Sequence, residues 1–181
     1  MSNLTVSDLP LAGLKLVKPQ VFEDARGYFL ETYHLQKFGA EVVRDAFVQD
    51  NLSNSKRGVL RGLHYQNPHP QGKLVAVIEG EIFDAVVDIR RDSPTFGKWF
   101  GVTLSESNHL QIYVPPGFAH GFCVTSEHAR VLYKCTDFYS PGSEHTIIWN
   151  DPEIGIAWPV HQPVLSDKDA QGVRLRDALI V

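Results

Sequence analysis

The chain contains only two cysteines, Cys123 and Cys135, and neither belongs to a C-x-x-C pair. So few cysteines do not support a disulfide framework, and they favour a reducing, cytoplasmic setting in which both are free strand residues. Long apolar runs are also missing, since none approaches the ~18 residues that a membrane-spanning helix needs. The first residues, MSNLTVSDLPLAGL, have neither the basic start nor the apolar stretch of a signal peptide. We therefore expect a protein with no membrane partner.

Positive charge is not in excess. The chain has 17 Lys and Arg against 21 Asp and Glu, which gives a formal net charge of -4. A broad basic surface for nucleic acid is therefore not expected. A small phosphate site built from a few local arginines is compatible with this balance.

Two motifs of catalytic sites are absent as well. The sequence has no H-x-H pair, which commonly supplies a metal centre together with a carboxylate and a third histidine, and His69 stands alone in its loop. It has no G-x-S-x-G turn for a nucleophilic serine. A metal site and nucleophilic catalysis are therefore not predicted, and general acid–base catalysis is the remaining chemistry.

Short apolar runs between turn signals make up most of the chain. Strands are predicted at 73–90 (two strands around Glu79-Gly80), 99–104, 109–125 (two strands), 129–139 and 145–150. Such regular spacing of residues rich in Val, Ile, Phe and Tyr indicates an antiparallel sandwich or barrel. Helices are expected only at the periphery, at 31–41 and at 166–173, where Ser166 is a candidate N-cap. We predict an all-β domain over residues 1–181.

One predicted strand, GVLRGLHYQ (58–66), carries Arg61 and His64 three positions apart. Strict alternation would place the two side chains on opposite faces of a sheet. Gly62 lies between them, and a glycine inside a strand often marks a bulge that re-aims a side chain. A bulge at Gly62 would let both side chains enter one pocket.

A barrel of this size encloses side chains or one small ligand, so polar residues on its strands are informative. They are Gln49, Asn51, Arg61, His64, Lys73, His120 and Tyr133. His64 could act as a base and Tyr133 could supply a proton, while Lys73 and His120 stabilise negative charge on an oxygen. That set suits proton abstraction next to a carbonyl group. Taken one at a time, His64, Tyr133 and Lys73 fit a core histidine, a sheet tyrosine and a solvent-exposed lysine better, and only the set as a whole makes the catalytic interpretation equally good.

Several blocks of sequence carry a family resemblance. They are EDARGYFLE (23–31), FVQDNLSNSKRGVLRGLHYQ (47–66), QGKLVAVIEGEIFDAVVDIR (71–90), VPPGFAHGF (114–122), YKCTDFYSPGSE (133–144) and LSDKD (165–169). In this order the chain resembles the dTDP-4-dehydrorhamnose 3,5-epimerase family from about residue 10 to 175. The resemblance implies a cupin-like jelly roll that needs no metal and no other cofactor.

The resemblance also implies a reaction. The family inverts C3 and C5 of dTDP-4-dehydro-6-deoxy-D-glucose to give dTDP-4-dehydro-β-L-rhamnose, through enolates formed beside the C4 ketone. By position, His64 is similar to the base, Asp169 to its carboxylate partner, Tyr133 to the acid on the other face and Lys73 to the residue that stabilises the enolate oxygen. Relatives that invert only C5 or only C3, or that isomerise the ketone, are the alternative, as is a sugar-nucleotide binding module without activity.

Further residues match substrate-binding positions of the family: Arg26, Phe29, Glu31, Gln49, Asn51, Arg61, His120, Tyr139, Glu144 and Lys168. Arg26 and Arg61 are similar to the diphosphate contacts, and the arginine fork suits that geometry. Tyr139 is similar to the aromatic residue that stacks on thymine. The family also implies a homodimer in which an N-terminal strand is exchanged and contributes to the neighbouring site.

Overall fold

Antiparallel strands dominate the computed structural model, which describes residues 4–180. The strands are β1 (Leu4–Asp8), β2 (Lys15–Pro19), β3 (Val21–Asp24), β4 (Gly27–Leu30), β5 (Gln49–Lys56), β6 (Leu60–Gln66), β7 (Lys73–Glu79), β8 (Glu81–Asp88), β9 (Trp99–Ser105), β10 (Gln111–Val114), β11 (Phe118–Val124), β12 (His128–Cys135) and β13 (Glu144–Thr146). The helices are α1 (Leu35–Glu41) and α2 (Asp167–Ala170), with 3-10 turns at Pro141–Ser143 and Leu175–Asp177. No helix in this part of the chain has the length and apolar character needed to cross a membrane.

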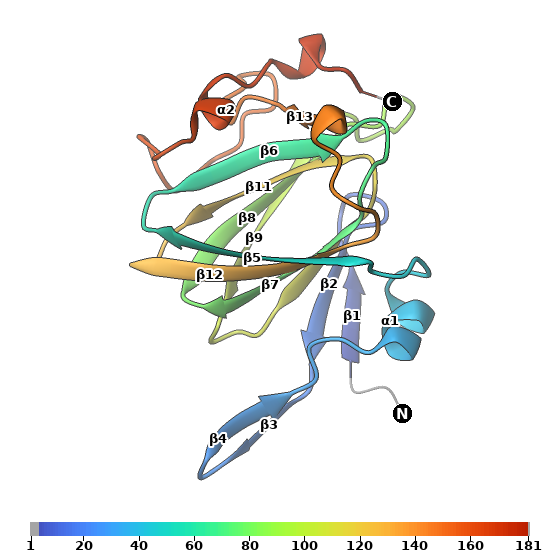
Figure 1. Cartoon of the computed structure of the whole chain (residues 1–181), viewed down its shortest axis with the longest axis vertical. Coiled ribbons are helices and arrows are strands. Elements are labelled where there is room, and N and C mark those ends of the chain that lie inside the picture. The colour runs from blue at the N-terminus through green and yellow to red at the C-terminus, as the bar shows by residue number, and fades with distance from the viewer. Residues whose placement is uncertain (1–3, 181) are drawn as a thin grey trace.

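Two sheets face one another and form a sandwich (Figure 1). One has six strands in the order β1-β2-β10-β7-β12-β5, and the other has five in the order β13-β6-β11-β8-β9. The strand pairs within both sheets are antiparallel. The prediction of an all-β, cupin-like sandwich with short peripheral helices is confirmed.

Alternation along the strands divides the apolar residues between the two faces of each sheet. In β8, Ile82 and Val86 join the core between the sheets, whereas Ala85 and Val87 face the C-terminal segment that covers the five-stranded sheet. Phe38 of α1 belongs to a third cluster, on the outer face of the six-stranded sheet. The five-stranded sheet is thus covered on both faces, and the six-stranded sheet is covered on its outer face only in part, since Leu52 of β5 and Ile78 of β7 are exposed there.

The core between the sheets changes character along its length. Val75 of β7 and Phe122 of β11 belong to the apolar cluster. Two residues away on the same strands, and so on the same faces, lie Lys73 and His120. Tyr133 of β12 packs against the edge of this cluster. The interior is therefore apolar at one end and polar at the other, and the polar end is the candidate site.

Several element predictions were wrong in their bounds: the strand expected over 129–139 ends at Cys135, and the helix expected over 166–173 ends at Ala170. The strand expected over 145–150 ends at Thr146. Ile147 still exchanges backbone hydrogen bonds with Leu63 of β6, and the pairing stops at Ile148, whose N–H donates to the Val173 carbonyl group. The helix expected over 31–41 begins only at Leu35. The strand pair at 73–90 and the Ser166 N-cap are confirmed.

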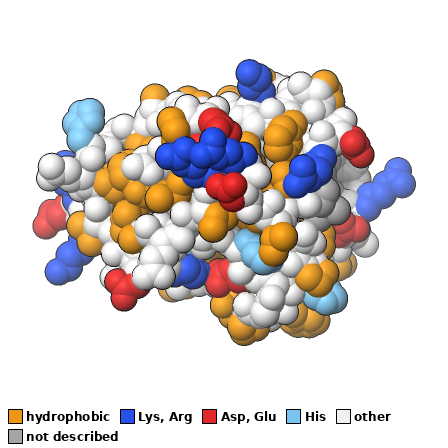
Figure 2. All heavy atoms as spheres, turned by 90° about the horizontal axis from the view of Figure 1, so that it is seen from above, with side chains coloured by type: hydrophobic (Ala, Val, Ile, Leu, Met, Phe, Trp, Pro, Cys, Tyr) orange, Lys and Arg blue, Asp and Glu red, His pale blue; other side chains and the backbone are white. Residues whose placement is uncertain are grey.

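The β3–β4 hairpin stands away from the sandwich (Figure 1). Three of its aromatic side chains, Phe22, Tyr28 and Phe29, are exposed. Seen from above, the molecule mixes basic, acidic and hydrophobic side chains, and neither sign of charge dominates this face (Figure 2). The hairpin is thus an arm with exposed aromatic side chains, of which the Tyr28 ring lies 4.7 Å from the His109 ring, between centroids.

Candidate active site

A bulge in β6 brings Arg61 and His64 to one cavity. His64 pairs with His120 of β11 and Arg61 pairs with Phe122, so three steps along β6 match two along β11. Gly62 makes this possible with a φ of 123°. A Cβ atom at Gly62 would lie 2.6 Å from the Cα of Gly121, so glycine is required there. The bulge that the sequence left open is therefore present.

The site consists of two adjoining cavities. One, of about 190 Å³, is lined by Ser53, Arg61, His64, Lys73, His120, Gly121, Phe122, Tyr133, Glu144 and Lys168. The other, of about 280 Å³, is lined by Gln49, Asn51, His64, Tyr65, Gln66, Gln71, Lys73, Tyr133, Tyr139 and Glu144. His64, Lys73, Tyr133 and Glu144 line both. Most residues singled out from the sequence are thus brought together in one cleft.

His64 and Asp169 form a hydrogen-bonded pair although 105 positions separate them. The His64 Nε2 and the Asp169 Oδ1 are 2.6 Å apart, and the carboxylate is buried. Burial alone would raise the pKa of Asp169, but hydrogen bonds from His64, from the Ser166 hydroxyl group and from the Gly62 N–H outweigh it and lower that pKa. An ionised Asp169 therefore orients the imidazole and stabilises its protonated form.

Lys73 and Tyr133 belong to the sheet that faces His64, on the neighbouring strands β7 and β12. Burial raises the pKa of the Tyr133 hydroxyl group, which keeps it protonated and able to donate. Burial also lowers the pKa of Lys73, and the charges of Cys135, Glu144 and Asp84 oppose this only in part. Lys73 therefore releases its proton more readily than a lysine in water.

A second His–carboxylate pair, which the sequence reading missed, lies deeper in the cleft. The His120 Nε2 is 2.7 Å from the Asp84 Oδ2, and both residues are buried. The other oxygen of Asp84 has no hydrogen-bond partner among the described residues. The sequence did contain a signal for this pair: Asp84 is an acidic residue on the inward-facing side of β8, between the core residues Ile82 and Val86.

Tyr139, Glu144 and Lys168 form a network at the rim. The Tyr139 hydroxyl group donates to one carboxylate oxygen of Glu144 at 3.0 Å, and the Lys168 Nζ donates to the other at 2.8 Å. Burial would raise the pKa of Glu144, but these two hydrogen bonds outweigh it and lower that pKa. The Tyr139 ring is 51% exposed, so a planar base can reach its face.

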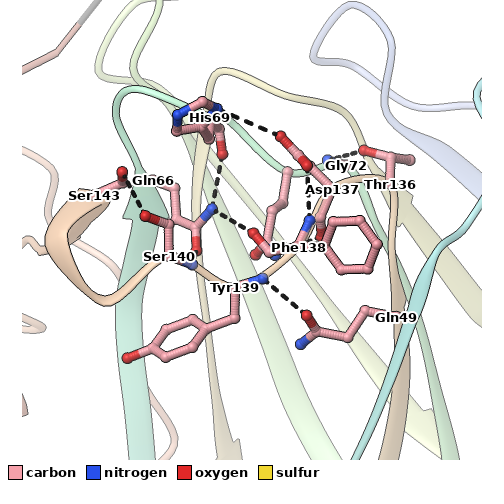
Figure 3. Close-up of polar contacts among 11 residues, drawn as sticks. Gln49, Gln66, His69, Gly72, Thr136, Asp137, Phe138, Tyr139, Ser140 and Ser143 are labelled. Atoms are coloured by element: carbon pink, nitrogen blue, oxygen red, sulfur yellow. Dashed lines mark hydrogen bonds and ion pairs between the residues drawn. The ribbon is translucent and has the colours of Figure 1, made fainter.

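Glutamine amides hold the loop that carries Tyr139 (Figure 3). Gln66 donates to the carbonyl groups of His69 and Phe138 and accepts from the Ser140 N–H at 2.9 Å. Gln49 accepts from the Tyr139 N–H at 2.8 Å. Gln66 was not singled out from the sequence, since its partner Phe138 lies 72 positions away. This loop is therefore fixed to β5 and β6 before any ligand binds.

Comparisons with known proteins decide the family. The family model of dTDP-4-dehydrorhamnose 3,5-epimerase matches residues 8–177. The chain belongs to this family. It is 55% identical over 170 residues to the dTDP-4-dehydrorhamnose 3,5-epimerase of Neisseria gonorrhoeae; this match covers 93% of the chain but only about half, 52%, of that relative.

Two further comparisons bear on the site. An epimerase structure from Legionella pneumophila in complex with dTDP-4-keto-L-rhamnose superposes with a TM-score of 0.93 at 47% identity, covering 96% of this chain and 93% of that one. A dTDP-4-dehydrorhamnose 3-epimerase of Streptomyces niveus is 38% identical over 172 residues, which are 94% of this chain and 83% of that relative. The predicted resemblance and the prediction of an epimerase are confirmed.

Three residues carried over from the family do not reach the cleft within one chain. Arg26 lies in the turn of the β3–β4 hairpin, where its guanidinium group bonds to Asp24. Phe29 is 70% exposed on the same hairpin, and Glu31, just after it, accepts from Lys37 at 2.7 Å. Their predicted binding roles stay predictions.

No three His, Cys, Asp or Glu side chains among residues 4–180 are grouped in the way that metal ligands are. His69, which the sequence analysis left without a role, lies on the surface 3.9 Å from Asp137.

Proposed function

We propose that the protein inverts C3 and C5 of dTDP-4-dehydro-6-deoxy-D-glucose to give dTDP-4-dehydro-β-L-rhamnose. One observation carries the proposal: His64 and Tyr133 line the same cleft from opposite sheets. A sugar ring held between the sheets presents one face to the imidazole and the other to the phenol. Inversion of a carbon needs that arrangement, since a single base tends to return the proton to the face it left.

His64 is the base in this proposal. It removes the proton from C3 or C5, both of which are acidified by the C4 ketone, and Asp169 stabilises the imidazolium that results. The electron pair of the C–H bond moves into the enolate. Asp169 has no path to the substrate in this scheme, because both of its oxygens accept hydrogen bonds from the protein.

Tyr133 and Lys73 complete the reaction. Lys73 donates to the developing enolate oxygen, and its lowered pKa suits that donation. Tyr133 then delivers its proton to the carbon from the opposite face, and its raised pKa keeps the proton available for this step. Exchange with solvent returns His64 and Tyr133 to their starting states.

The nucleotide is assigned to the rim. Tyr139 offers an exposed ring for thymine, and Arg61, Gln49, Asn51, His120, Glu144 and Lys168 line the path from there to His64. Arg61 is the cation in the cleft that suits the diphosphate, because its guanidinium fork can bind two phosphate oxygens. The family resemblance supports each of these assignments.

We infer that Arg26, Phe29 and Glu31 serve the cleft of a second copy of the chain. The hairpin that carries Arg26 and Phe29 projects from its own sandwich (Figure 1), and its aromatic side chains Phe22, Tyr28 and Phe29 are exposed. Burial of such an apolar surface against a partner is favourable. A homodimer with an exchanged N-terminal strand would supply that partner, as the family resemblance implies.

The cytoplasm is the proposed compartment. Cys123 and Cys135 are both free and buried in strands. Free cysteines suit a reducing environment such as the cytoplasm.

Proton NMR in deuterated water tests the reaction. The purified chain is mixed with dTDP-4-dehydro-6-deoxy-D-glucose, and deuterium entry is followed at C3 and C5 separately. We expect entry at both carbons. Entry at one carbon would make the protein a single-site epimerase like the named relative from Streptomyces niveus, and entry at neither would refute the role of His64.

A further inference from the structure

The carboxylate of Asp169 has a third partner besides His64 and the Gly62 N–H. The Ser166 Oγ lies 2.7 Å from the Asp169 Oδ2, the oxygen that His64 does not contact. His64 and the Gly62 N–H both bond to the Oδ1, at 2.6 and 3.2 Å. Both carboxylate oxygens therefore accept hydrogen bonds, and Ser166 alone holds the one that is remote from His64.

Ser166 contacts Asp169 twice. As the N-cap of α2, its oxygen accepts from the Asp169 backbone N–H at 3.2 Å, while its hydroxyl proton goes to the carboxylate. In an ordinary capping box the side chain at the third helical position reaches back to the backbone N–H of the cap residue. Here that side chain is turned toward His64 instead, and the serine hydroxyl group donates to it.

The surroundings of the pair contain both signs of charge. The titratable groups that share its cavity are Arg61, Lys73, His120, Tyr133, Glu144 and Lys168, and Asp167 lies in the same turn of α2. Asp169 itself is buried, and no cation but His64 bonds to it. Its ionised form therefore depends on the hydrogen bonds of His64, Gly62 and Ser166, of which only the last can be removed by a side-chain change outside the cavity.

We propose that Ser166 is a positioning residue for the reaction: its hydroxyl group fixes the Asp169 carboxylate in the orientation and the ionised state that support His64. This inference rests on the proposed function, because it assigns Ser166 a role through the proposed base. Ser166 does not line the cleft, so it acts on the chemical step and not on substrate affinity.

Three substitutions separate the hydroxyl group from the helix cap. Ser166→Thr keeps both the cap and the hydroxyl donor. Ser166→Gly removes the hydroxyl group but keeps most of the capping preference, and Ser166→Ala removes both. Ser93→Ala is the matched control, because the Ser93 hydroxyl group also donates to a buried carboxylate, that of Asp88, outside the cleft.

The readout is deuterium entry at C3 and C5 at saturating substrate, followed across pH. For Ser166→Gly and Ser166→Ala we expect exchange to slow about tenfold with KM unchanged, as for a lost hydrogen bond to a charged group. Without the Ser166 hydrogen bond, the Asp169 carboxylate is less stabilised as an anion. The His64–Asp169 pair therefore takes up its proton at a higher pH. The acid limb of the rate profile should therefore move up by about one pH unit. Ser166→Thr and Ser93→Ala should match the unsubstituted protein.

Each outcome either supports or overturns the positioning role of Ser166. If Ser166→Gly exchanges like the unsubstituted protein while Ser166→Ala is impaired, Ser166 is only a helix cap and the inference is overturned. The same holds if every loss follows the folded fraction and the acid limb stays in place. His64→Ala, measured alongside, tests the proposed function separately: normal exchange in that variant would refute the function, whatever Ser166 does.

Discussion

An aspartate and an arginine two positions apart form an ion pair at two places in the chain, once inside the sandwich and once on the projecting hairpin. Asp88 and Arg90 are paired where β8 ends, and the Asp88 side chain is 0% exposed. Asp24 and Arg26 repeat the arrangement in the hairpin turn, where the Arg26 side chain is 90% exposed. In both pairs the arginine backbone N–H also donates to the aspartate.

The difference lies in what surrounds each pair. Asp88 accepts further hydrogen bonds from Ser93 and Thr95, so its carboxylate is fully enclosed by partners of its own chain. Among the described residues, Asp24 has only Arg26 as a side-chain partner. The sandwich encloses its aspartate within one chain, whereas the hairpin leaves an arginine and aromatic side chains exposed. Each prediction below tests one side of this contrast.

The largest effect is expected inside the sandwich, for His64→Ala. Loss of the general base should slow deuterium entry at C3 and C5 by about a hundredfold or more. Affinity for dTDP should be retained, because His64 contacts the reacting sugar and not the nucleotide in the proposed mode. Calorimetric titration with dTDP measures the second quantity. Turnover close to that of the unsubstituted protein would rule out the proposed mechanism.

Tyr133→Phe separates the two faces of the sugar. His64 remains, so substrate protons should still exchange with solvent, but product should form about a hundredfold more slowly without the acid. The ratio of exchange to product, read from one NMR time course, is the measurement. If that ratio stays unchanged, the acid is another residue of the cleft.

Asp88→Asn tests the buried pair through stability. Burial alone would raise the pKa of Asp88, but hydrogen bonds from Arg90, Ser93 and Thr95 outweigh it and place that pKa well below the usual range. A lowered pKa stabilises the fold above the ordinary aspartate pKa, and this contribution is lost as the pH falls below it. Near neutral pH we expect Asp88→Asn to lower the free energy of unfolding by about 2 kcal/mol, because a donor to the carboxylate is left unpaired.

Urea unfolding at neutral pH and in acid measures that loss. The difference between Asp88→Asn and the unsubstituted protein should shrink as the pH falls, since protonation removes the same charge. A difference that is constant with pH would mean that packing around Asp88, and not its charge, stabilises this corner of the sandwich.

Arg26→Ala tests the hairpin side. If Arg26 binds the diphosphate, KM should rise about tenfold with kcat unchanged, as for a lost charge-assisted hydrogen bond. Mixing Arg26→Ala chains with His64→Ala chains then asks whose cleft Arg26 serves. In a mixed dimer with exchanged hairpins, one cleft regains both residues, so activity at low substrate should exceed the sum of the two variants. If the mixture shows only the sum, Arg26 acts within its own chain or not at all.

The contrast also explains what could be read from the sequence. Short apolar runs such as those of β7 and β8 predicted the sandwich, and Gly62 suggested a bulge, because both signals are local. Asp84 and Gln66 escaped notice, since their partners lie 36 and 72 positions away and a lone polar residue in a strand has many explanations. The exposure of the hairpin was harder still to read from the sequence, because Phe22 and Phe29 are of a residue type that strands usually bury.

The smallest effect is expected for Asp24→Asn. Hydrogen bonds from Arg26 lower the pKa of Asp24, but both side chains are exposed to solvent. Hydration and screening by salt therefore offset much of what the ion pair contributes to stability. We expect Tm to stay unchanged, both near neutral pH and in acid, in thermal unfolding of the ligand-free protein beside Asp88→Asn. A loss as large as that of Asp88→Asn would mean that a second copy buries this pair as completely as the sandwich buries Asp88. The hairpin would then belong to a dry interface, and Arg26 would not be free to bind a diphosphate at the rim of the partner's cleft.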